Sequence, residues 1–192
     1  MSRKKDVTDL KNLINTQLKS KVLQTFDEGS DLTIPRISSG ILALDQVLGK
    51  GSNGYGFPKG RVMEVYGPES GGKTSVALST IASVQKAGGI CAFIDAEHSL
   101  NLEYAKQLGV IVDELLICTP MSSEEAFDVA DTLAGSNQVD LVVLDSLAAL
   151  TPEKIVESSY EDKHYDGGAK TNNQWAKKVS AICGKSGCTV LI

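Results

Sequence analysis

The sequence predicts an α/β fold in which helices cover both faces of a mostly parallel, twisted sheet. From residue 61 onward, short apolar runs of strand length alternate with segments that have the three- and four-residue periodicity of helices. Several of these runs are apolar nearly throughout, which is typical of strands that are buried on both faces. A glycine-rich segment joins the first of these strands to the first helix, as in α/β proteins that bind anions at a helix N-terminus.

The chain begins with a segment that we expect to form an amphipathic helix. Its apolar side chains recur at three- and four-residue steps; they are Val7, Leu10, Ile14, Leu18 and Val22. A polar break at residues 27–31 and a short extended piece at residues 32–37 follow. We therefore expect an N-terminal arm over residues 1–33 and a core over residues 34–192.

The core is expected to alternate strands and helices after a glycine-rich loop at residues 49–58. The expected strands are residues 61–66, 90–94, 115–118, 141–144 and 189–192. The expected helices between them are residues 74–87, 101–108, 123–134 and 172–184. Residues 189–192 have the composition of a central strand, after which a parallel sheet normally continues, so we expect the core to be incomplete at its carboxyl end.

The composition is that of an ordinary globular protein. The 192 residues are 42% hydrophobic and 22% charged. No apolar run approaches the roughly 18 residues that a membrane-spanning helix needs, and the polar start has no apolar signal core behind it. We therefore expect a cytoplasmic protein with no membrane partner. The net charge of −5 argues against a globally basic nucleic-acid binder but leaves room for a local basic groove.

The four cysteines indicate buried, reduced thiols rather than a metal site or a disulfide framework. Cys91, Cys118, Cys183 and Cys188 have no paired C-x-x-C spacing. Cys91 and Cys118 also lie in strand-like apolar runs, where a free cysteine behaves as a small apolar side chain.

One segment fits the phosphate-binding pattern G-x-x-x-x-G-K-[ST] at every fixed position. It reads Gly67-Pro68-Glu69-Ser70-Gly71-Gly72-Lys73-Thr74. Glycines let backbone N–H groups curl around an anion, Lys73 can reach the β- and γ-phosphates, and the Thr74 hydroxyl can ligate Mg²⁺. Because a strand precedes the segment and a helix follows it, the pattern predicts a nucleotide site rather than a glycine-rich turn with a chance lysine.

Two carboxylates at the ends of expected strands are candidates for the same site. Asp145 follows the apolar run at residues 141–144 and can hold Mg²⁺ through its water shell. Glu97 follows the run at residues 90–94, at the sheet edge where a carboxylate can deprotonate an attacking water. An alternative stays open, in which Asp95 and Glu97 only cap the helix that follows.

Four motifs, in this order and spacing, resemble those of the bacterial RecA recombinases. They are Gly67–Thr74, Phe93-Ile94-Asp95-Ala96-Glu97-His98, the pair Tyr104-Ala105 with Leu108-Gly109-Val110, and Val143–Pro152. The resemblance is dense from about Ile37 to Pro152 and returns more weakly from Gln174 to Ile192. It implies a RecA-like P-loop ATPase core with an N-terminal arm for oligomerisation.

The resemblance also implies a role for each site residue, with ATP and Mg²⁺ as cofactors. Lys73 and Thr74 would cradle ATP and Mg²⁺, Asp145 would support the metal, and Glu97 would activate the water. The rest of the phosphate loop, Gly67, Pro68, Glu69, Ser70, Gly71 and Gly72, would contact the nucleotide.

On the adenine side, the resemblance implies that Tyr104 stacks on the base. The alternative is a partly exposed helix tyrosine. Asn101 stands where members of the family commonly carry an Asp, and its amide can still hydrogen-bond the base.

By resemblance, residues 156–170 correspond to the first of two mobile loops through which the family binds single-stranded DNA. His164, Tyr165 and Lys170 are the candidate contacts, with Tyr165 as a wedge or stacking face and the other two for phosphate. The alternative is a solvated acidic loop, because its acids, Glu157, Glu161, Asp162 and Asp166, make the segment no more basic than acidic. The second DNA loop is expected beyond Ile192.

The resemblance implies a DNA-dependent ATPase that forms helical homo-oligomeric filaments on single-stranded DNA. Such a filament would pair homologous duplex DNA and exchange strands in recombinational repair. The arm would pack on a neighbouring protomer; packing on its own domain is the alternative. Two other functions stay open: an ATP-binding module that caps or regulates a full-length filament without exchanging strands, and a ring helicase or clock-type ATPase, against which the segment at residues 95–98 argues.

Overall fold

The computed structural model describes residues 3–25, 34–153 and 168–192. The chain separates into two compact units, Met1–Ile34 and Pro35–Ile192, and each is described by itself. No helix in the described ranges is both long and apolar enough to cross a bilayer.

The first unit contains helix α1 (Arg3–Leu18), which is shorter than the amphipathic pattern predicts. Val22 therefore lies outside the helix. The helix ends because Lys19 adopts a left-handed conformation, with φ at 49°. The side-chain amide of Asn15 then accepts from Leu23 N at 2.9 Å and donates to Leu23 O at 2.8 Å, so the chain folds back instead of continuing the helix.

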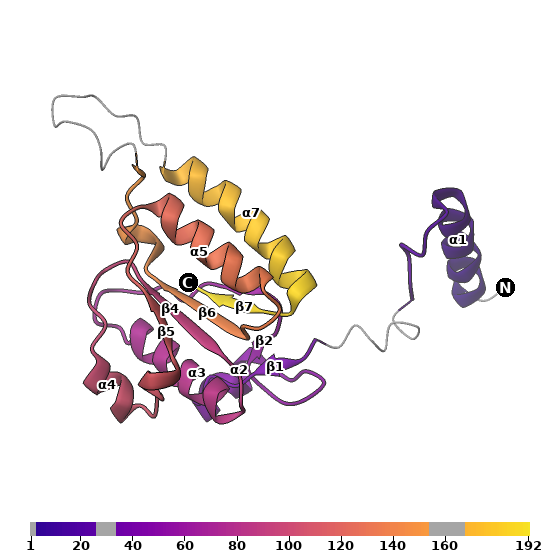
Figure 1. The fold of residues 1–192 in the computed structure, drawn as a ribbon. Helices are drawn as coiled ribbons and strands as arrows, with labels where there is room; N and C mark the ends of the chain where they lie inside the picture. The colour runs from indigo at the N-terminus through magenta and orange to yellow at the C-terminus, as the bar shows by residue number, and fades with distance from the viewer. Residues whose placement is uncertain (1–2, 26–33, 154–167) are drawn as a thin grey trace. The chain divides into compact units, whose positions relative to one another are not determined.

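The second unit is built on a five-stranded sheet in which every neighbouring pair is parallel (Figure 1). In spatial order the strands are β3 (Val62–Met63), β7 (Thr189–Leu191), β6 (Leu141–Asp145), β4 (Cys91–Asp95) and β5 (Leu116–Cys118). The α/β fold with a parallel sheet is confirmed. The first strand is shorter than expected, since only Val62 and Met63 pair with β7 in the ladder.

Among the described residues, four helices alternate with these strands: α3 (Lys73–Lys86), α4 (Leu102–Gln107), α5 (Ser123–Gly135) and α7 (Gly168–Ser186). Two 3₁₀ turns, η2 (Val112–Glu114) and η3 (Leu147–Ala149), lie in the connections. Each helix lies within a few residues of its predicted bounds, except that α7 begins four residues earlier.

The sheet separates two apolar cores. Side chains of α3 and α4 pack with Phe93 and Val143 on one face, and side chains of α5 and α7 pack with Ile94 and Leu144 on the other. Successive residues of β4 and β6 thus point to opposite faces, both of which are covered. This double burial explains why the two strands are apolar along almost their whole length.

Three of the four cysteines are core residues. Cys91 lies in the first core, and Cys183 and Cys188 lie in the second, each with at most 1% of its surface exposed. Burial raises the pKa of Cys91 and Cys188 to about 12 and that of Cys183 to about 11. Cys118 is half-buried.

A small antiparallel pair and a short helix precede the main sheet; of these, only an extended piece at residues 32–37 was predicted. Strand β1 (Arg36–Ile37) pairs with β2 (Phe57–Pro58), and helix α2 (Leu42–Leu48) lies between them in sequence. The buried carboxylate of Asp45 anchors α2, because it accepts hydrogen bonds from the Ser38 hydroxyl and from both the amide and the hydroxyl of Ser39, at 2.6–2.7 Å.

Candidate nucleotide-binding site

The phosphate loop connects β3 to α3 at the carboxyl edge of the sheet. Gly72 is the N-cap of α3 and has a φ of 86°, a conformation that strongly favours glycine. Ser70, with a φ of 58°, and a hydrogen bond from Gly71 N to Pro68 O at 3.2 Å complete the turn. The free N–H groups at the start of α3 therefore face the loop, which is the geometry that binds an anion.

The ammonium group of Lys73 lies across this loop. Its Nζ donates to the carbonyl oxygens of Gly67 at 3.2 Å and Pro68 at 3.0 Å. These two carbonyls hold the positive charge beside the first turn of α3, where a phosphate bound by the loop would meet it.

A direct hydrogen bond joins the loop to β6. The Thr74 hydroxyl donates to Asp145 Oδ2 at 2.6 Å, although the two residues are 71 positions apart. A hydroxyl and a carboxylate are hard oxygen ligands of the kind that Mg²⁺ binds. No cluster of three or more potential metal-binding side chains occurs in the parts of the chain that the structure describes. The pair therefore fits a cation that takes its remaining ligands from phosphates and water.

The two acids at the carboxyl end of β4, Asp95 and Glu97, have different partners. Asp95 is 5% exposed and accepts from Ser99 N at 3.1 Å and Leu100 N at 3.0 Å, so it caps the turn that follows the strand. Glu97 is exposed and accepts instead from the Ser146 hydroxyl at 2.8 Å. Neither acid caps the helix that follows, whose N-cap is Asn101: Asp95 holds the turn before it, and Glu97 faces the end of β6.

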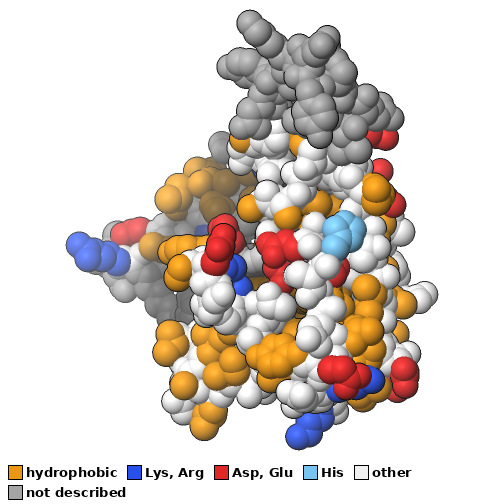
Figure 2. Space-filling model, turned by 90° about the vertical axis from the view of Figure 1, so that its left-hand side faces the viewer, with side chains coloured by type: hydrophobic (Ala, Val, Ile, Leu, Met, Phe, Trp, Pro, Cys, Tyr) orange, Lys and Arg blue, Asp and Glu red, His pale blue; other side chains and the backbone are white. Residues whose placement is uncertain are grey.

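Lys73, Thr74, Glu97 and Asp145 share one cavity of about 380 Å³. The other lining residues belong to the phosphate loop and the start of α3; they are Glu69, Ser70, Gly71, Gly72 and Ser75. The C-terminus mark in Figure 1 shows that the strands point to the left, which is the side facing the viewer in Figure 2. Acidic and basic side chains lie close together near the middle of that face.

The two predicted adenine contacts lie on and just before α4. Asn101 caps this helix, because its Oδ1 accepts from Tyr104 N at 3.0 Å. Tyr104 is 39% exposed, and its hydroxyl is hydrogen-bonded to the Ser75 hydroxyl at 2.8 Å. The ring of Tyr104 thus stays beside the start of α3, although neither residue lines the 380 Å³ cavity.

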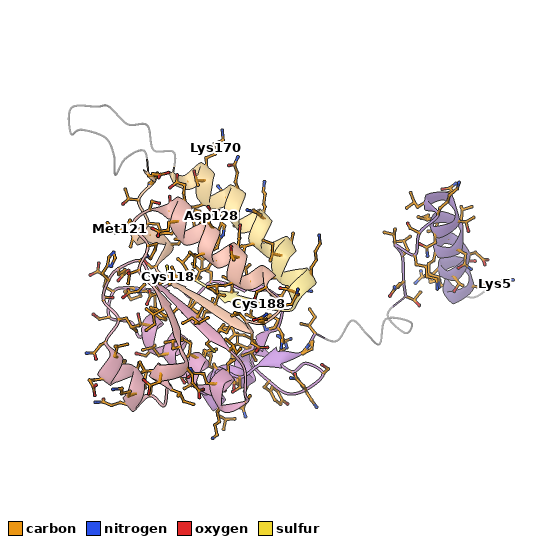
Figure 3. All side chains as sticks on the ribbon, in the orientation of Figure 1. Lys5, Cys118, Met121, Asp128, Lys170 and Cys188 are labelled. Atoms are coloured by element: carbon orange, nitrogen blue, oxygen red, sulfur yellow. The ribbon has the colours of Figure 1, made fainter. Side chains whose placement is uncertain are left out.

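The predicted DNA contacts are only partly placed. His164 and Tyr165 lie outside the described residues. Lys170 lies in the first turn of α7, with an exposed side chain (Figure 3). It does not line the cavity around the phosphate loop.

Two serines of the site were not predicted. Ser75 holds Tyr104, and Ser146 holds Glu97. The only sequence signal for either is its position directly after a predicted ligand, Thr74 or Asp145. Serine is common at such positions for many reasons, so the partner could not be inferred.

The comparisons with known proteins bear on this geometry. The family model of the RecA N-terminal domain matches residues 6–192. The protein belongs to this family. RecA membership agrees with the observed parallel sheet and with the phosphate loop between β3 and α3.

Three relatives show the extent of the similarity. The chain is 48% identical to Protein RecA of Sulfurimonas denitrificans (strain ATCC 33889 / DSM 1251) over 160 residues, 83% of this chain and 45% of the relative. It is 51% identical to Protein RecA of Sulfurovum sp. (strain NBC37-1) over 158 residues, 82% of this chain and 44% of the relative. With Protein RecA of Nostoc punctiforme (strain ATCC 29133 / PCC 73102), the identity is 43% over 189 residues, 98% of this chain and 51% of the relative. The chain thus spans about half the length of the curated relatives it matches.

Proposed function

We propose that this chain binds ATP with Mg²⁺ and hydrolyses it in a DNA-dependent manner, within filaments formed on single-stranded DNA. The filaments would pair homologous duplex DNA and exchange strands in recombinational repair. One observation carries the proposal: Lys73, Thr74, Asp145 and Glu97 line a single cavity at the carboxyl edge of a parallel sheet. Membership of the RecA N-terminal domain family supports the DNA part of the proposal.

The phosphate loop supplies the binding energy for the triphosphate. Free N–H groups at the start of α3 would hold the β-phosphate, and Lys73 would exchange its two carbonyl acceptors for phosphate oxygens. Thr74 and Asp145 would hold Mg²⁺, which, when bound, supplies neutralisation of charge on the phosphates.

Glu97 is the group on this cavity best suited to act as a general base. Its carboxylate lies at the end of the strand next to the one that carries Asp145, and it is hydrogen-bonded on one oxygen by Ser146. The other oxygen is available to orient a water and to take its proton. Lys170, with His164 and Tyr165, would contact DNA, and the arm would contact a neighbouring protomer.

The test is ATP hydrolysis with and without single-stranded DNA, together with nucleotide binding measured separately. We expect Lys73→Ala to lower kcat/KM by about 10²–10³-fold, because it removes a charge aimed at the phosphates. Glu97→Gln should keep nucleotide binding and lower turnover by about 10²–10⁴-fold. Lys86→Ala is the matched control, since Lys86 lies in the last turn of the same helix, away from the cavity.

The outcomes separate the candidate functions. DNA-stimulated turnover that Lys73→Ala removes supports the recombinase function. Nucleotide binding without stimulated turnover supports instead a module that caps or regulates a filament. A wild-type chain that binds no nucleotide, or a Lys73→Ala variant that equals wild type, would contradict both.

A further inference from the structure

A second cavity, of about 500 Å³, lies at the amino edge of the sheet, away from the phosphate loop. Gly89 and Asp140, which precede β4 and β6, form part of its wall, and so do Ser83, Val84 and Ala87 of the last turns of α3. β1 and the loop before β2 close the other side. A cavity of this size is within the range that holds small organic ligands.

Arg36, on β1, carries a charge in this wall that no carboxylate of the described residues compensates. Its Nη1 donates only to Gly56 O, at a long 3.3 Å. Its Nε is the only buried side-chain nitrogen or oxygen without a hydrogen-bond partner in the described ranges, and no carboxylate there forms an ion pair with the guanidinium. An unsatisfied buried donor is costly, so an incoming acceptor that pairs with it would be favoured.

The two acids of the same wall are already occupied. Asp140 pairs with Lys59 at 2.8 Å and also accepts from Ile90 N at 3.2 Å. Asp45 uses both oxygens for the hydroxyls and the amide of the two serines before α2. The charged side chains of the lining are thus two basic ones, Arg36 and Lys59, and two acidic ones, Asp45 and Asp140. Of the two basic groups, Lys59 is paired, so the guanidinium of Arg36 is the one that an anion could meet.

The wall also offers an apolar side. Tyr55 is 48% exposed and Leu42 is 75% exposed. The loop that carries Tyr55 is held in place, because Lys50 and Tyr55 form a β-bridge and Asn53 is hydrogen-bonded through its side chain to both Arg36 N at 2.6 Å and Arg36 O at 3.1 Å. The aromatic ring and the guanidinium are therefore presented from a fixed backbone.

We propose that this cavity is a binding site for a small organic anion, in which a carboxylate or phosphate group is attached to a planar ring. The planar guanidinium of Arg36 can turn so that Nε and a second N–H face the two oxygens of one anion. The ring of the ligand would pack on Tyr55 and Leu42. This site is separate from the nucleotide site and does not rest on the proposed function.

The experiment titrates the whole chain with four probes. Phenyl phosphate and benzoate carry both ring and anion, inorganic phosphate carries the anion alone, and phenol carries the ring alone. NMR of isotope-labelled arginine side chains follows Arg36 Nε–H, and the Tyr55 ring signals follow the apolar side. Backbone signals of Gly72 report any binding at the phosphate loop, so the two sites are read separately.

We expect phenyl phosphate and benzoate to shift the signals of Arg36 and Tyr55 together, with a Kd on the order of 1 mM. The stronger of the two probes identifies the anion as phosphate or carboxylate. Arg36→Gln should weaken binding about tenfold or more. Arg61→Gln, the matched control, removes an exposed arginine that does not line the cavity and should change the affinity less than about twofold.

Tyr55→Ala is a second variant, outside the core, and it should weaken phenyl phosphate more than inorganic phosphate. Three results would overturn the proposal: no shift at Arg36 with any probe, equal effects of Arg36→Gln and Arg61→Gln, or binding of phenol as strong as that of phenyl phosphate. The first would describe a cavity that holds only water, and the last a purely apolar site.

Discussion

At the residue scale, two hydroxyl groups orient the two carboxylates of the candidate nucleotide site. Thr74 donates to Asp145, and Ser146 donates to Glu97, each from a different segment of the chain. Both donors are uncharged, so they orient the carboxylates without neutralising them. The arrangement suits Asp145 as a support for a cation and Glu97 as a carboxylate that keeps its ability to take a proton.

Ser146 can be tested as a positioning residue for Glu97. We expect Ser146→Ala to leave nucleotide binding unchanged and to lower ATP turnover about tenfold, because the Glu97 carboxylate loses one hydrogen bond that orients it. Ser146→Thr should restore part of the activity. In a Glu97→Gln background, the Ser146→Ala change should have no further effect on turnover. Additive losses in the double variant would show that Ser146 acts independently of Glu97.

The buried thiols predict how stability depends on pH. The pKa of Cys91 is raised to about 12, first by burial and then by the charge of Asp140, from 9.0 for an exposed thiol. The unfolded chain therefore releases this proton first, so the contribution of Cys91 to stability is complete below about pH 9 and is lost as pH rises toward 12. Urea unfolding at neutral pH and at about pH 10 measures the loss.

Cys91→Ala provides the control for this prediction. The free energy of unfolding should fall less steeply with pH in the variant than in wild type, even though the variant is less stable overall because it leaves a small cavity. Parallel pH profiles would show that ionisation of Cys91 is not linked to unfolding.

At the scale of elements, α5 and α7 are joined by one aromatic and polar cluster. The rings of Phe127 and Trp175 are stacked, with centroids 4.5 Å apart and an interplanar angle of 12°. Asp131 accepts from Trp175 Nε1 at 3.1 Å and pairs with Lys178 at 2.8 Å. The hydrogen bond and charge of Asp131 also raise the pKa of Lys178. The cluster fixes α7, whose first turn carries Lys170.

We expect Asp131→Ala to lower the free energy of unfolding by about 1–3 kcal/mol, because it leaves the Trp175 N–H without its acceptor. Asp131→Asn keeps an acceptor and should cost less. Urea unfolding followed by fluorescence measures both, since Trp175 is the only tryptophan of the chain. Asp128→Ala, on the exposed side of the same helix, should change stability by less than about 0.5 kcal/mol. Equal effects at the two positions would contradict the role of Asp131.

The helices and strands of the core were predictable where the local pattern is strong. Ser122 caps α5 by accepting from Glu125 N, and β4 and β6 are apolar because both faces are covered. Helix α2 was missed because its seven residues are anchored by Asp45 through tertiary hydrogen bonds rather than by a local cap. The order of the strands, with β7 between β3 and β6, could not be predicted, because it depends on contacts between distant segments.

The candidate site also contains both residues that the sequence predicts and residues that only the folded structure identifies. Lys73, Thr74, Glu97 and Asp145 were expected from motifs, and the structure brings them to one cavity. The partners that orient them, Ser146 above all, follow from the folded geometry and have no spacing of their own. The cavity beside Arg36 could not be predicted from the sequence either, since its walls come from four separate stretches of the chain.

At the scale of the whole molecule, the two units differ in how far their apolar side chains are buried. The described members of both core clusters come from the second unit. In the first unit, Val7, Leu10, Leu13 and Leu18 of α1 are each more than half exposed. Apolar side chains arranged in this way are typical of a helix that packs on another surface.

We expect a variant without residues 1–34 to keep its core. Its melting temperature should lie within a few degrees of that of the full chain, because the variant keeps every described member of both core clusters. Its self-association should weaken sharply, as measured by sedimentation velocity over a range of concentrations. A shortened chain that fails to fold would contradict the first expectation, and one that associates as strongly as the full chain would contradict the second.

The place of β7 in the sheet has a consequence for the order of events during protein synthesis. Strand β3, which leads into the phosphate loop, is bonded within the described sheet only to β7, and Val65 N donates to Ile192 O just beyond it. The ribosome makes β3 long before it makes residues 189–192. A nascent chain therefore carries the complete phosphate-loop motif while residues 75–188 are made, before the strand that holds the motif in place exists. We expect the candidate site to form only after β7 has emerged from the exit tunnel.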